Sequence, residues 1–193
     1  MPEIDFGLII RPSSFDLPIR SDELPDYNRR CIQAVSSAFT TIWVEDHLQW
    51  DSDDTLENFT TLSYLAAEFP NFRVGNLVLC QSYRNPALVA KMAANLHFLT
   101  GGRYILGIGA GWKTDEYLAY GYSIPSPTER WEQLEEALVI IRSLWTSRPA
   151  TFEGKHYQIR DAYCEPQPLP PIPILPGYFP YRWWIIQHAL LMA

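Results

Sequence analysis

The sequence predicts an α/β protein built around a parallel sheet. Short β-rich segments alternate with longer segments of helical periodicity, and four such strand–helix units fill residues 4–146. Parallel strands joined by crossover helices need both faces of their sheet covered, which is the arrangement of the α/β class. The chain is 47% apolar and 19% charged, a composition that indicates an ordinary globular core rather than a disordered chain.

The first unit starts with the apolar run 4–10. This run is broken by Arg11-Pro12 and predicts a buried strand. Pro25 is tolerated in a first helical turn, so a helix is expected from there to about Phe39. Its apolar positions at roughly helical spacing are Ile32, Val35 and Phe39.

The second unit starts with the β-rich segment 41–44. Asp54 and Glu57 have the spacing of a capping box, which predicts the start of a helix. The helix is expected to end before Pro70, because proline cannot continue it. Its predicted apolar face comprises Leu56, Phe59, Leu62, Leu65 and Ala66.

The third unit combines a strand over 72–79 with a helix that Asn85-Pro86 opens and Gly101-Gly102 closes. The apolar positions of this helix are Leu88, Val89, Met92, Ala93, Leu96 and Leu99. His97 lies within it, where a histidine is more often a packed or solvent-facing side chain than a ligand.

The fourth unit has a strand over 104–108 and a glycine-rich turn. Its helix starts where Ser126, Pro127 and Glu129 combine an N-cap, a first-turn proline and a capping-box glutamate. Trp131, Leu134, Leu138, Ile141 and Trp145 form its apolar face.

The pattern changes after Trp145. Residues 152–155 suggest a short turn, and five prolines within 166–173 predict an extended, semi-rigid stretch. Residues 172–175 suggest the start of a fifth strand. The aromatic segment 176–193 does not continue the alternation.

Charge and composition limit the class of protein. Fifteen Lys and Arg face 22 Asp and Glu, giving a net charge of −7, and no basic cluster is present to neutralise phosphates, so a nucleic-acid partner is not expected. The acidic start lacks the basic region of a signal peptide, and no apolar run approaches the ~20 residues of a membrane-spanning helix. We therefore expect a soluble cytoplasmic protein.

The three cysteines lie far apart in the sequence and predict neither a disulfide framework nor a metal site.

Two strand ends offer candidate chemistry. Asp46-His47 follows the second predicted strand, and α/β folds bind ligands beyond the carboxyl ends of their strands. A histidine there suits proton transfer near neutral pH, although Asp46 capping a turn beside a surface His47 is the plainer interpretation. Cys80 ends the third strand and either lines the same rim or is a small buried hydrophobe.

The glycines at 107, 109 and 111 follow the fourth strand. They permit either a close backbone approach to a ring or phosphate, or simply a tight turn. The dinucleotide fingerprint is excluded, because Trp112 stands where its third glycine would lie.

Several motifs, in order along the chain, resemble the luciferase-like monooxygenase family, and more narrowly its branch of probable coenzyme F-420 (F420)-dependent oxidoreductases. The resemblance covers residues 4–175. The motifs that carry it are 43–47 (WVEDH), 83–91 (YRNPALVAK), 99–103 (LTGGR), 106–112 (LGIGAGW), Glu116-Tyr117, 135–138 (EEAL), 152–155 (FEGK) and the proline-rich run to Ile174.

The resemblance implies a TIM-type (β/α)8 barrel with a cofactor at its C-terminal mouth. Residues 1–175 would then be the N-terminal half, with about four βα units and the start of a fifth strand, and 176–193 a divergent tail of a truncated or frame-shifted gene. A barrel takes ~250 residues, so the half-barrel would expose sheet edges through which it could form a homo-oligomer.

The resemblance also implies a deazaflavin cofactor, coenzyme F420, with FMN as the alternative. The reaction would be hydride transfer or monooxygenation on a small organic substrate. His47 would be the catalytic, proton-handling residue. The residues that would contact the cofactor are Asp46, Leu79, Cys80, Ala110 and Gly111, and some members have a non-prolyl cis peptide or a bulge near Leu79-Cys80.

One departure from the family bears on the substrate. Sugar-phosphate dehydrogenases of the family have a glutamate where this chain has Trp112, so their substrate is not assumed here. Two other classes of function stay open: an inactive remnant of such an enzyme, and a non-catalytic half-barrel that serves as an interaction module.

Overall fold

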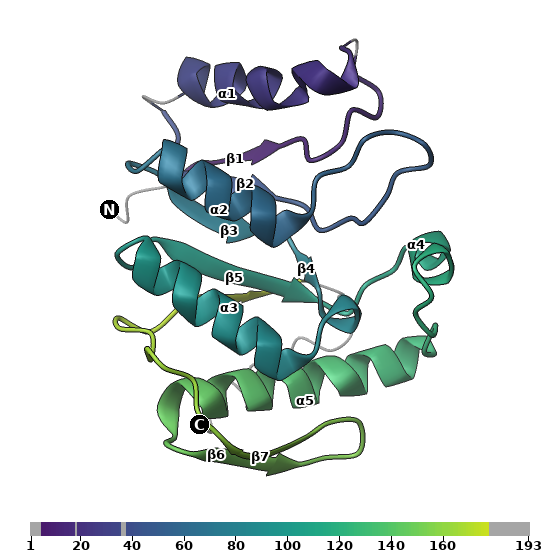
Figure 1. Ribbon diagram of the computed structural model, residues 1–193, viewed down its shortest axis with the longest axis vertical. Coiled ribbons are helices and arrows are strands. Elements are labelled where there is room, and N and C mark those ends of the chain that lie inside the picture. The colour runs from purple at the N-terminus through teal and green to yellow at the C-terminus, as the bar shows by residue number, and fades with distance from the viewer. Residues whose placement is uncertain (1–4, 18, 36–37, 178–193) are drawn as a thin grey trace.

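A parallel sheet forms the centre of the molecule in the computed structural model, which describes residues 5–17, 19–35 and 38–177 (Figure 1). The strands follow the order β1-β2-β3-β5-β4, and β8 pairs with β5. All of these pairings are parallel. The strands are β1 (Gly7–Ile10), β2 (Thr41–Val44), β3 (Arg73–Asn76), β4 (Leu79–Cys80), β5 (Tyr104–Gly109) and β8 (Ile174–Pro176).

The third predicted strand is interrupted. Both β3 and β4 pair with β5, so they form one line of chain with a break at Leu77-Val78. The peptide bond between Leu77 and Val78 is cis, two residues before the position that the family resemblance suggested.

Helices cover the outer face of the sheet (Figure 1). Two short 3₁₀ turns, η1 (Ser21–Glu23) and η2 (Gln81–Tyr83), accompany them. The α-helices are α1 (Leu24–Val35), α2 (Asn58–Glu68), α3 (Pro86–Leu99), α4 (Thr114–Ala119) and α5 (Pro127–Thr146). The alternation of strands and helices confirms the α/β class, and five parallel strand positions with their helices make a partial (β/α)8 barrel.

The two faces of the sheet are filled differently. Toward the helices, Ile42, Val44 and Val74 are fully buried in the main core. On the other face the indole of Trp43 lies across Gly7 and Gly75, where a side chain at either glycine would collide with its ring. Ile9, next to this indole, is 50% exposed. The inner face is therefore less completely covered than the helical face.

Two helix starts were predicted correctly. Asn85 accepts a hydrogen bond from the Ala87 N–H and caps α3, which then closes through the left-handed Gly101 and Gly102. Ser126 and Glu129 form the complete capping box of α5. In both cases the residues that make the cap are neighbours in sequence, so the sequence alone contains the signal.

The predicted capping box at Asp54 is wrong. Glu57 itself caps α2 by accepting hydrogen bonds from the N–H groups of Phe59 and Thr60. Asp54 belongs instead to a loop that pairs with residues 12–14, where its carbonyl accepts from the Ser14 N–H at 3.1 Å.

The predicted face of α3 is also partly wrong, because Leu88 and Leu99 are exposed. Ala90 and Ala94 are buried in their place. These small side chains let α3 approach α5 closely, and the Trp145 indole N–H of α5 donates to the Ala90 carbonyl at 3.0 Å.

The turn predicted at 152–155 is displaced: Phe152 and Glu153 belong to β6 (Ala150–Glu153), and the turn lies at 154–157, before β7 (Gln158–Ala162), in a hairpin that was not expected. β6 alternates inward-facing Ala150 and Phe152 with exposed Thr151 and Glu153 but is only four residues long, and β7 has no regular alternation, so the sequence signal is weak. The predicted fifth strand is present as β8. Nearly all of the segment 176–193 lies outside the described residues, so its separate status stays a prediction.

We expect Ser126→Ala to lower the free energy of unfolding by about 0.5–2 kcal/mol, because the Glu129 N–H loses its acceptor at the start of α5. Urea denaturation followed by circular dichroism measures this change. Thr128→Ala, an exposed hydroxyl in the same first turn, is the control and should change stability by no more than about 0.5 kcal/mol. Equal losses in the two variants would contradict the capping role.

Candidate active site

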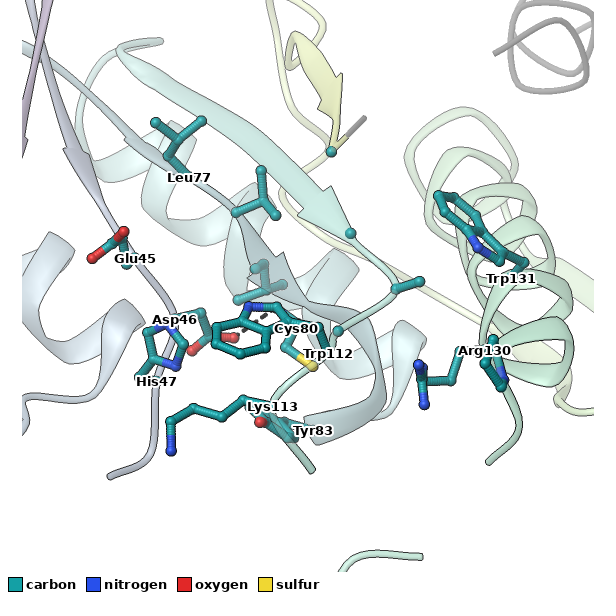
Figure 2. A pocket seen from close by; sticks show the side chains of 17 residues that line it. Glu45, Asp46, His47, Leu77, Cys80, Tyr83, Trp112, Lys113, Arg130 and Trp131 are labelled. Atoms are coloured by element: carbon teal, nitrogen blue, oxygen red, sulfur yellow. Dashed lines mark hydrogen bonds between the residues drawn. The ribbon is translucent and has the colours of Figure 1, made fainter. Parts of the chain in front are cut away.

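One cavity of about 600 Å³ lies at the carboxyl ends of β2, β4 and β5 (Figure 2). Pockets of this size commonly bind cofactors and small molecules. All six site residues predicted from the sequence line it: Asp46, His47, Leu79, Cys80, Ala110 and Gly111. The parallel sheet brings them together, because its strands all end at the same edge.

Backbone forms one wall of the cavity. Gly111 has a φ of 76°, in the left-handed region that glycine adopts at no steric cost. A Cβ at Gly111 would collide with the Tyr117 hydroxyl and would lie 2.6 Å from Cys80 Sγ. Gly109, at the end of β5, likewise leaves room for Val78. The segment 109–111 therefore offers a surface of peptide groups with only the methyl group of Ala110 on it.

Asp46 is buried, and its carboxylate is fully engaged by the protein. Oδ2 accepts from the Cys80 N–H at 2.8 Å and from the Arg84 guanidinium at 2.7 Å, and Oδ1 accepts from Arg84 at 2.9 Å. Direct contact of Asp46 with a cofactor stays a prediction. In the structure its carboxylate fixes the end of β4 against the end of β2.

Arg84 connects this ion pair to α2, because it also donates to Glu57 at 2.6 Å. Burial alone would lower the pKa of Arg84, but its hydrogen bonds and ion pairs with Asp46 and Glu57 outweigh burial and raise that pKa. The pKa of Glu57 is lowered, because the Thr60 N–H and Arg84 outweigh the opposing effect of burial. The guanidinium thus remains charged between two carboxylates.

The buried side-chain amides of Asn58 and Asn76 also stabilise the ends of β2 and β3. Asn58 donates to the carbonyls of Val44 at 2.8 Å and Glu45 at 3.1 Å, just beyond β2. Asn76 donates to the Asn58 side chain and accepts from the Tyr104 hydroxyl. These hydrogen bonds satisfy backbone carbonyls where the sheet ends, which keeps the edge of the cavity in place.

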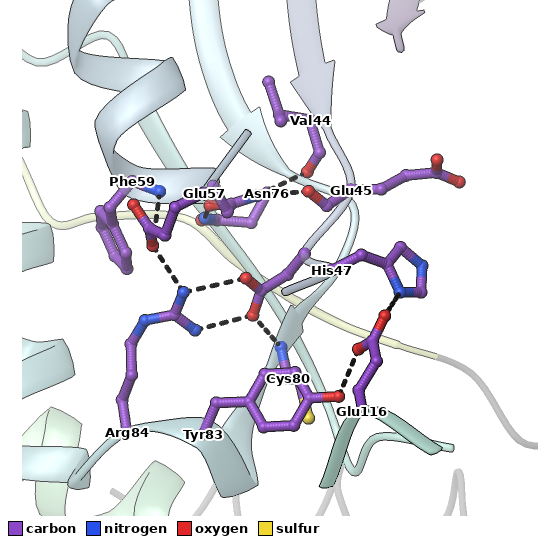
Figure 3. A network of polar contacts seen from close by, with 12 residues as sticks. Val44, Glu45, His47, Glu57, Phe59, Asn76, Cys80, Tyr83, Arg84 and Glu116 are labelled. Carbon is purple, nitrogen blue, oxygen red and sulfur yellow. Dashed lines mark hydrogen bonds and ion pairs between the residues drawn. The ribbon is translucent and has the colours of Figure 1, made fainter. Parts of the chain in front are cut away.

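His47, next to Asp46 in sequence, is held by a different element. Its Nδ1 lies 2.8 Å from Oε1 of Glu116, a fully buried residue of α4 (Figure 3). Its ring contacts two indoles edge-on, with centroids 4.9 Å from Trp50 and 6.0 Å from Trp112. His47 is therefore a partly buried cavity residue, and the plainer interpretation of it as a surface residue is wrong.

Cys80 forms an apolar part of the wall. Burial raises the pKa of its thiol to about 11, an effect that the hydrogen bond with Tyr117 only partly offsets. The thiol is thus neutral at physiological pH and is not a nucleophile.

Two cations stand at the rim of the cavity. Lys113 pairs with Asp115 and lies over the Trp50 ring at 5.0 Å. Arg130, on the first turn of α5, donates to the Pro125 carbonyl, but its buried Nε has no acceptor among the described residues. A buried donor without a partner is costly, so Arg130 is suited to an anionic ligand group.

The structure adds site residues that the sequence argument did not assign. Glu116 had been noted only as part of a motif, and nothing local links it, Arg84 or Arg130 to residues 46–47. His97, by contrast, is a packed helix residue as expected, with Nε2 2.8 Å from the Pro170 carbonyl. Across the described ranges, no group of three His, Cys, Asp or Glu side chains could hold a metal ion, and no helix has the length and hydropathy of a membrane span.

A partial (β/α)8 barrel with a cavity at its carboxyl-terminal edge is the architecture of a cofactor- or substrate-binding barrel. Residues 6–177 match the family model of the luciferase-like monooxygenases. This match covers most of the chain, so the protein belongs to the luciferase-like monooxygenase family.

Curated relatives and solved structures agree with this assignment. An F420-dependent glucose-6-phosphate dehydrogenase of Kineococcus radiotolerans is 36% identical over 74% of this chain and 43% of its own length. An F420-dependent hydroxymycolic acid dehydrogenase of Mycobacterium tuberculosis is 32% identical over 87% of this chain and 46% of its own. This chain thus spans less than half the length of these two relatives.

An F420-dependent secondary alcohol dehydrogenase in complex with an F420–acetone adduct has a TM-score of 0.77 at 23% identity, covering 89% of this chain and 51% of that structure. The oxygenating constituent of 3,6-diketocamphane monooxygenase of Pseudomonas putida, in complex with FMN, has a TM-score of 0.66 at 23% identity. The match covers 80% of this chain and 43% of that structure. At this identity the two structures support the fold.

We expect Asp46→Asn to lower the free energy of unfolding by about 3–5 kcal/mol, because it leaves buried Arg84 without one of its two carboxylates. Urea denaturation measures the loss. Asp26→Asn makes the same chemical change in an exposed ion pair with Arg29 and should cost no more than about 1 kcal/mol. A cost for Asp46→Asn as small as that of the control would show that the buried pair does not hold the strand ends.

We expect Cys80 to resist alkylation by iodoacetamide, because with a pKa of about 11 only about one thiol in a thousand is ionised at pH 8. Mass spectrometry of digested protein, sampled over time, measures the modification of each cysteine. Half-buried Cys31 is the internal comparison and should react first. Alkylation of Cys80 at the rate of Cys31 would contradict a buried, neutral thiol.

Proposed function

We propose that this chain carries the cofactor half of a coenzyme F420-dependent oxidoreductase. In this proposal the deazaflavin lies in the cavity at the ends of β2, β4 and β5, beside His47. The observation that carries the proposal is the convergence of all six predicted residues on one cavity. The F420-dependent relatives, at 36% and 32% identity, support the choice of cofactor.

The residues present fit such a group. A planar ring would lie on the peptide surface of 109–111, where glycines leave room for it. The uncharged wall of Leu79 and Cys80 would border the ring. Arg130, whose Nε has no acceptor, would bind an anionic group of the cofactor or the substrate. When bound, coenzyme F420 supplies the redox chemistry, since its ring exchanges a hydride at C5.

The protein's own part is binding, orientation and proton handling. His47 would accept or return a proton at the substrate oxygen while hydride is transferred, a task suited to an imidazole near neutral pH. The exposed indole of Trp112, close to His47, would shield the reacting groups from water on the open side of the cavity. The substrate is a small organic molecule.

A second candidate is FMN with monooxygenase chemistry. The fold shared with the FMN complex of the diketocamphane monooxygenase favours it, because both cofactors present a planar tricyclic ring and an anionic phosphate. An inactive remnant or a half-barrel interaction module remains the alternative if neither cofactor binds.

A fluorescence titration of the purified chain with oxidised and reduced F420 and FMN tests the proposal. We expect saturable binding of F420, weakened about tenfold in His47→Ala through the loss of one hydrogen-bonding and ring contact. His156→Ala, which removes a histidine paired with Glu132 on α5 outside the cavity, is the control and should bind as the wild type does.

Each outcome separates the candidates. Tighter binding of FMN than of F420 would favour the second candidate, an FMN-dependent monooxygenase. If the chain is folded but binds neither cofactor, the remaining functions are an inactive remnant and a half-barrel interaction module. Equal weakening of cofactor binding by His47→Ala and His156→Ala would show that His47 does not contact the cofactor.

A further inference from the structure

We infer that Glu116 is a positioning residue that fixes the tautomer of His47, so that its Nε2 is an unprotonated hydrogen-bond acceptor at the cavity. The hydrogen bond between His47 Nδ1 and Glu116 Oε1, at 2.8 Å, is the starting observation. A carboxylate only accepts hydrogen bonds, so Nδ1 must donate. A neutral imidazole carries one proton, and that proton is then on Nδ1 rather than on Nε2.

The other two polar contacts of the Glu116 side chain are also with hydrogen-bond donors. Its other oxygen, Oε2, accepts the hydroxyl of Tyr83 at 2.5 Å. Burial and the hydrogen bond to Glu116 both raise the pKa of Tyr83, so this hydroxyl retains its proton and remains a donor. Lys113 Nζ lies 3.9 Å from Oε1 and adds a positive charge nearby. Each oxygen of this fully buried carboxylate thus faces a donor.

The position of Glu116 is also fixed. It lies on α4, whose neighbouring residue Tyr117 is buried against Tyr83 and shares a hydrogen bond with Cys80 at 3.3 Å. The Tyr122 hydroxyl, just beyond α4, donates to the Tyr83 carbonyl at 3.1 Å. α4 and the segment after β4 therefore hold each other, and the carboxylate between them has little freedom to turn away from His47.

The remaining nitrogen of His47 is the one available to a ligand. Among the described residues Nε2 has no hydrogen-bond partner, while the ring borders the cavity between Trp50 and Trp112. The orientation thus offers a proton acceptor, not a donor, to the bound molecule. This is the arrangement by which a buried carboxylate orients a catalytic histidine in hydrolase triads.

The chemical consequence rests on the proposed function. In the oxidation of a substrate alcohol, the carbinol C–H bond breaks and its hydrogen leaves with the electron pair to the oxidised deazaflavin ring. The O–H electron pair forms the new C=O bond, and the O–H proton passes to Nε2 of His47. The Glu116 carboxylate then stabilises the imidazolium. An unprotonated Nε2 would thus suit substrates that carry a hydroxyl group on the carbon to be oxidised.

The tautomer is measured by NMR on ¹⁵N-histidine-labelled protein without cofactor, so the result does not depend on activity. The chain has four histidines, and His47→Asn identifies the signals of His47 by their loss. We expect a proton on Nδ1 and none on Nε2 in the neutral wild type. A neutral His47 with its proton on Nε2 would overturn the inference, whether or not the cofactor titration supports the proposed function.

The Glu116→Gln variant provides a second test of the inference. The amide has one acceptor for two donors, Nδ1–H and the Tyr83 hydroxyl, so we expect a mixture of His47 tautomers. With F420 and a secondary alcohol, we expect kcat to fall about 100-fold or more while the cofactor Kd changes less than twofold. Glu116→Asp, which keeps the carboxylate, should recover part of the loss.

Glu132→Gln is the matched control, because it makes the same chemical change in a glutamate of α5 that lies 2.9 Å from His156 Nε2, outside the cavity. It should leave the tautomer unchanged and kcat within about twofold of the wild-type value. An unchanged tautomer in a folded Glu116→Gln protein would overturn the inference, as would equal losses of kcat in Glu116→Gln and Glu132→Gln. The wild-type spectrum remains decisive if Glu116→Gln does not fold.

Discussion

The buried carboxylate of Asp46 is the group on which the geometry of the site depends. It accepts the Cys80 N–H and two N–H groups of Arg84, and Arg84 in turn reaches Glu57 at the start of α2. The ends of β2 and β4 and the start of α2 are thus joined through one cluster of charges. A buried charge without a partner is costly, so these elements keep their spacing together.

Neighbouring residues at the end of β2 have separate tasks. Asp46 faces Arg84 and the backbone of β4, whereas His47 faces Glu116 on α4 (Figure 3). Successive side chains of an extended chain point to opposite sides, which lets one residue stabilise the edge of the sheet while the next borders the cavity. The Asp-His pair therefore links the stability of the fold to the chemistry of the site.

The partial barrel concentrates its ligand-binding features at one edge. The peptide surface of 109–111, the indole of Trp112 and the guanidinium of Arg130 line the same cavity (Figure 2), and the indole of Trp50 contacts His47. On the inner face of the sheet, the indole of Trp43 lies across Gly7 and Gly75. In the described part of the chain, β1 and β8 each pair with a strand on one side only. The parts of the site described here come from the first five strand positions of the barrel.

The sequence by itself determined the features that neighbouring residues encode. The alternation of strands and helices, the caps at Asn85 and Ser126, and the position of Asp46-His47 after a strand all follow from local periodicity and local hydrogen bonding. Only the tertiary structure decided that Glu57 rather than Asp54 caps α2, because a distant loop engages Asp54. It alone also decided the partner of His47, since Glu116 lies 69 residues away and meets it only through the packing of α4 over the end of the sheet. Long-range hydrogen bonds of this kind leave no periodic pattern in a sequence, because their geometry exists only once the strands share an edge.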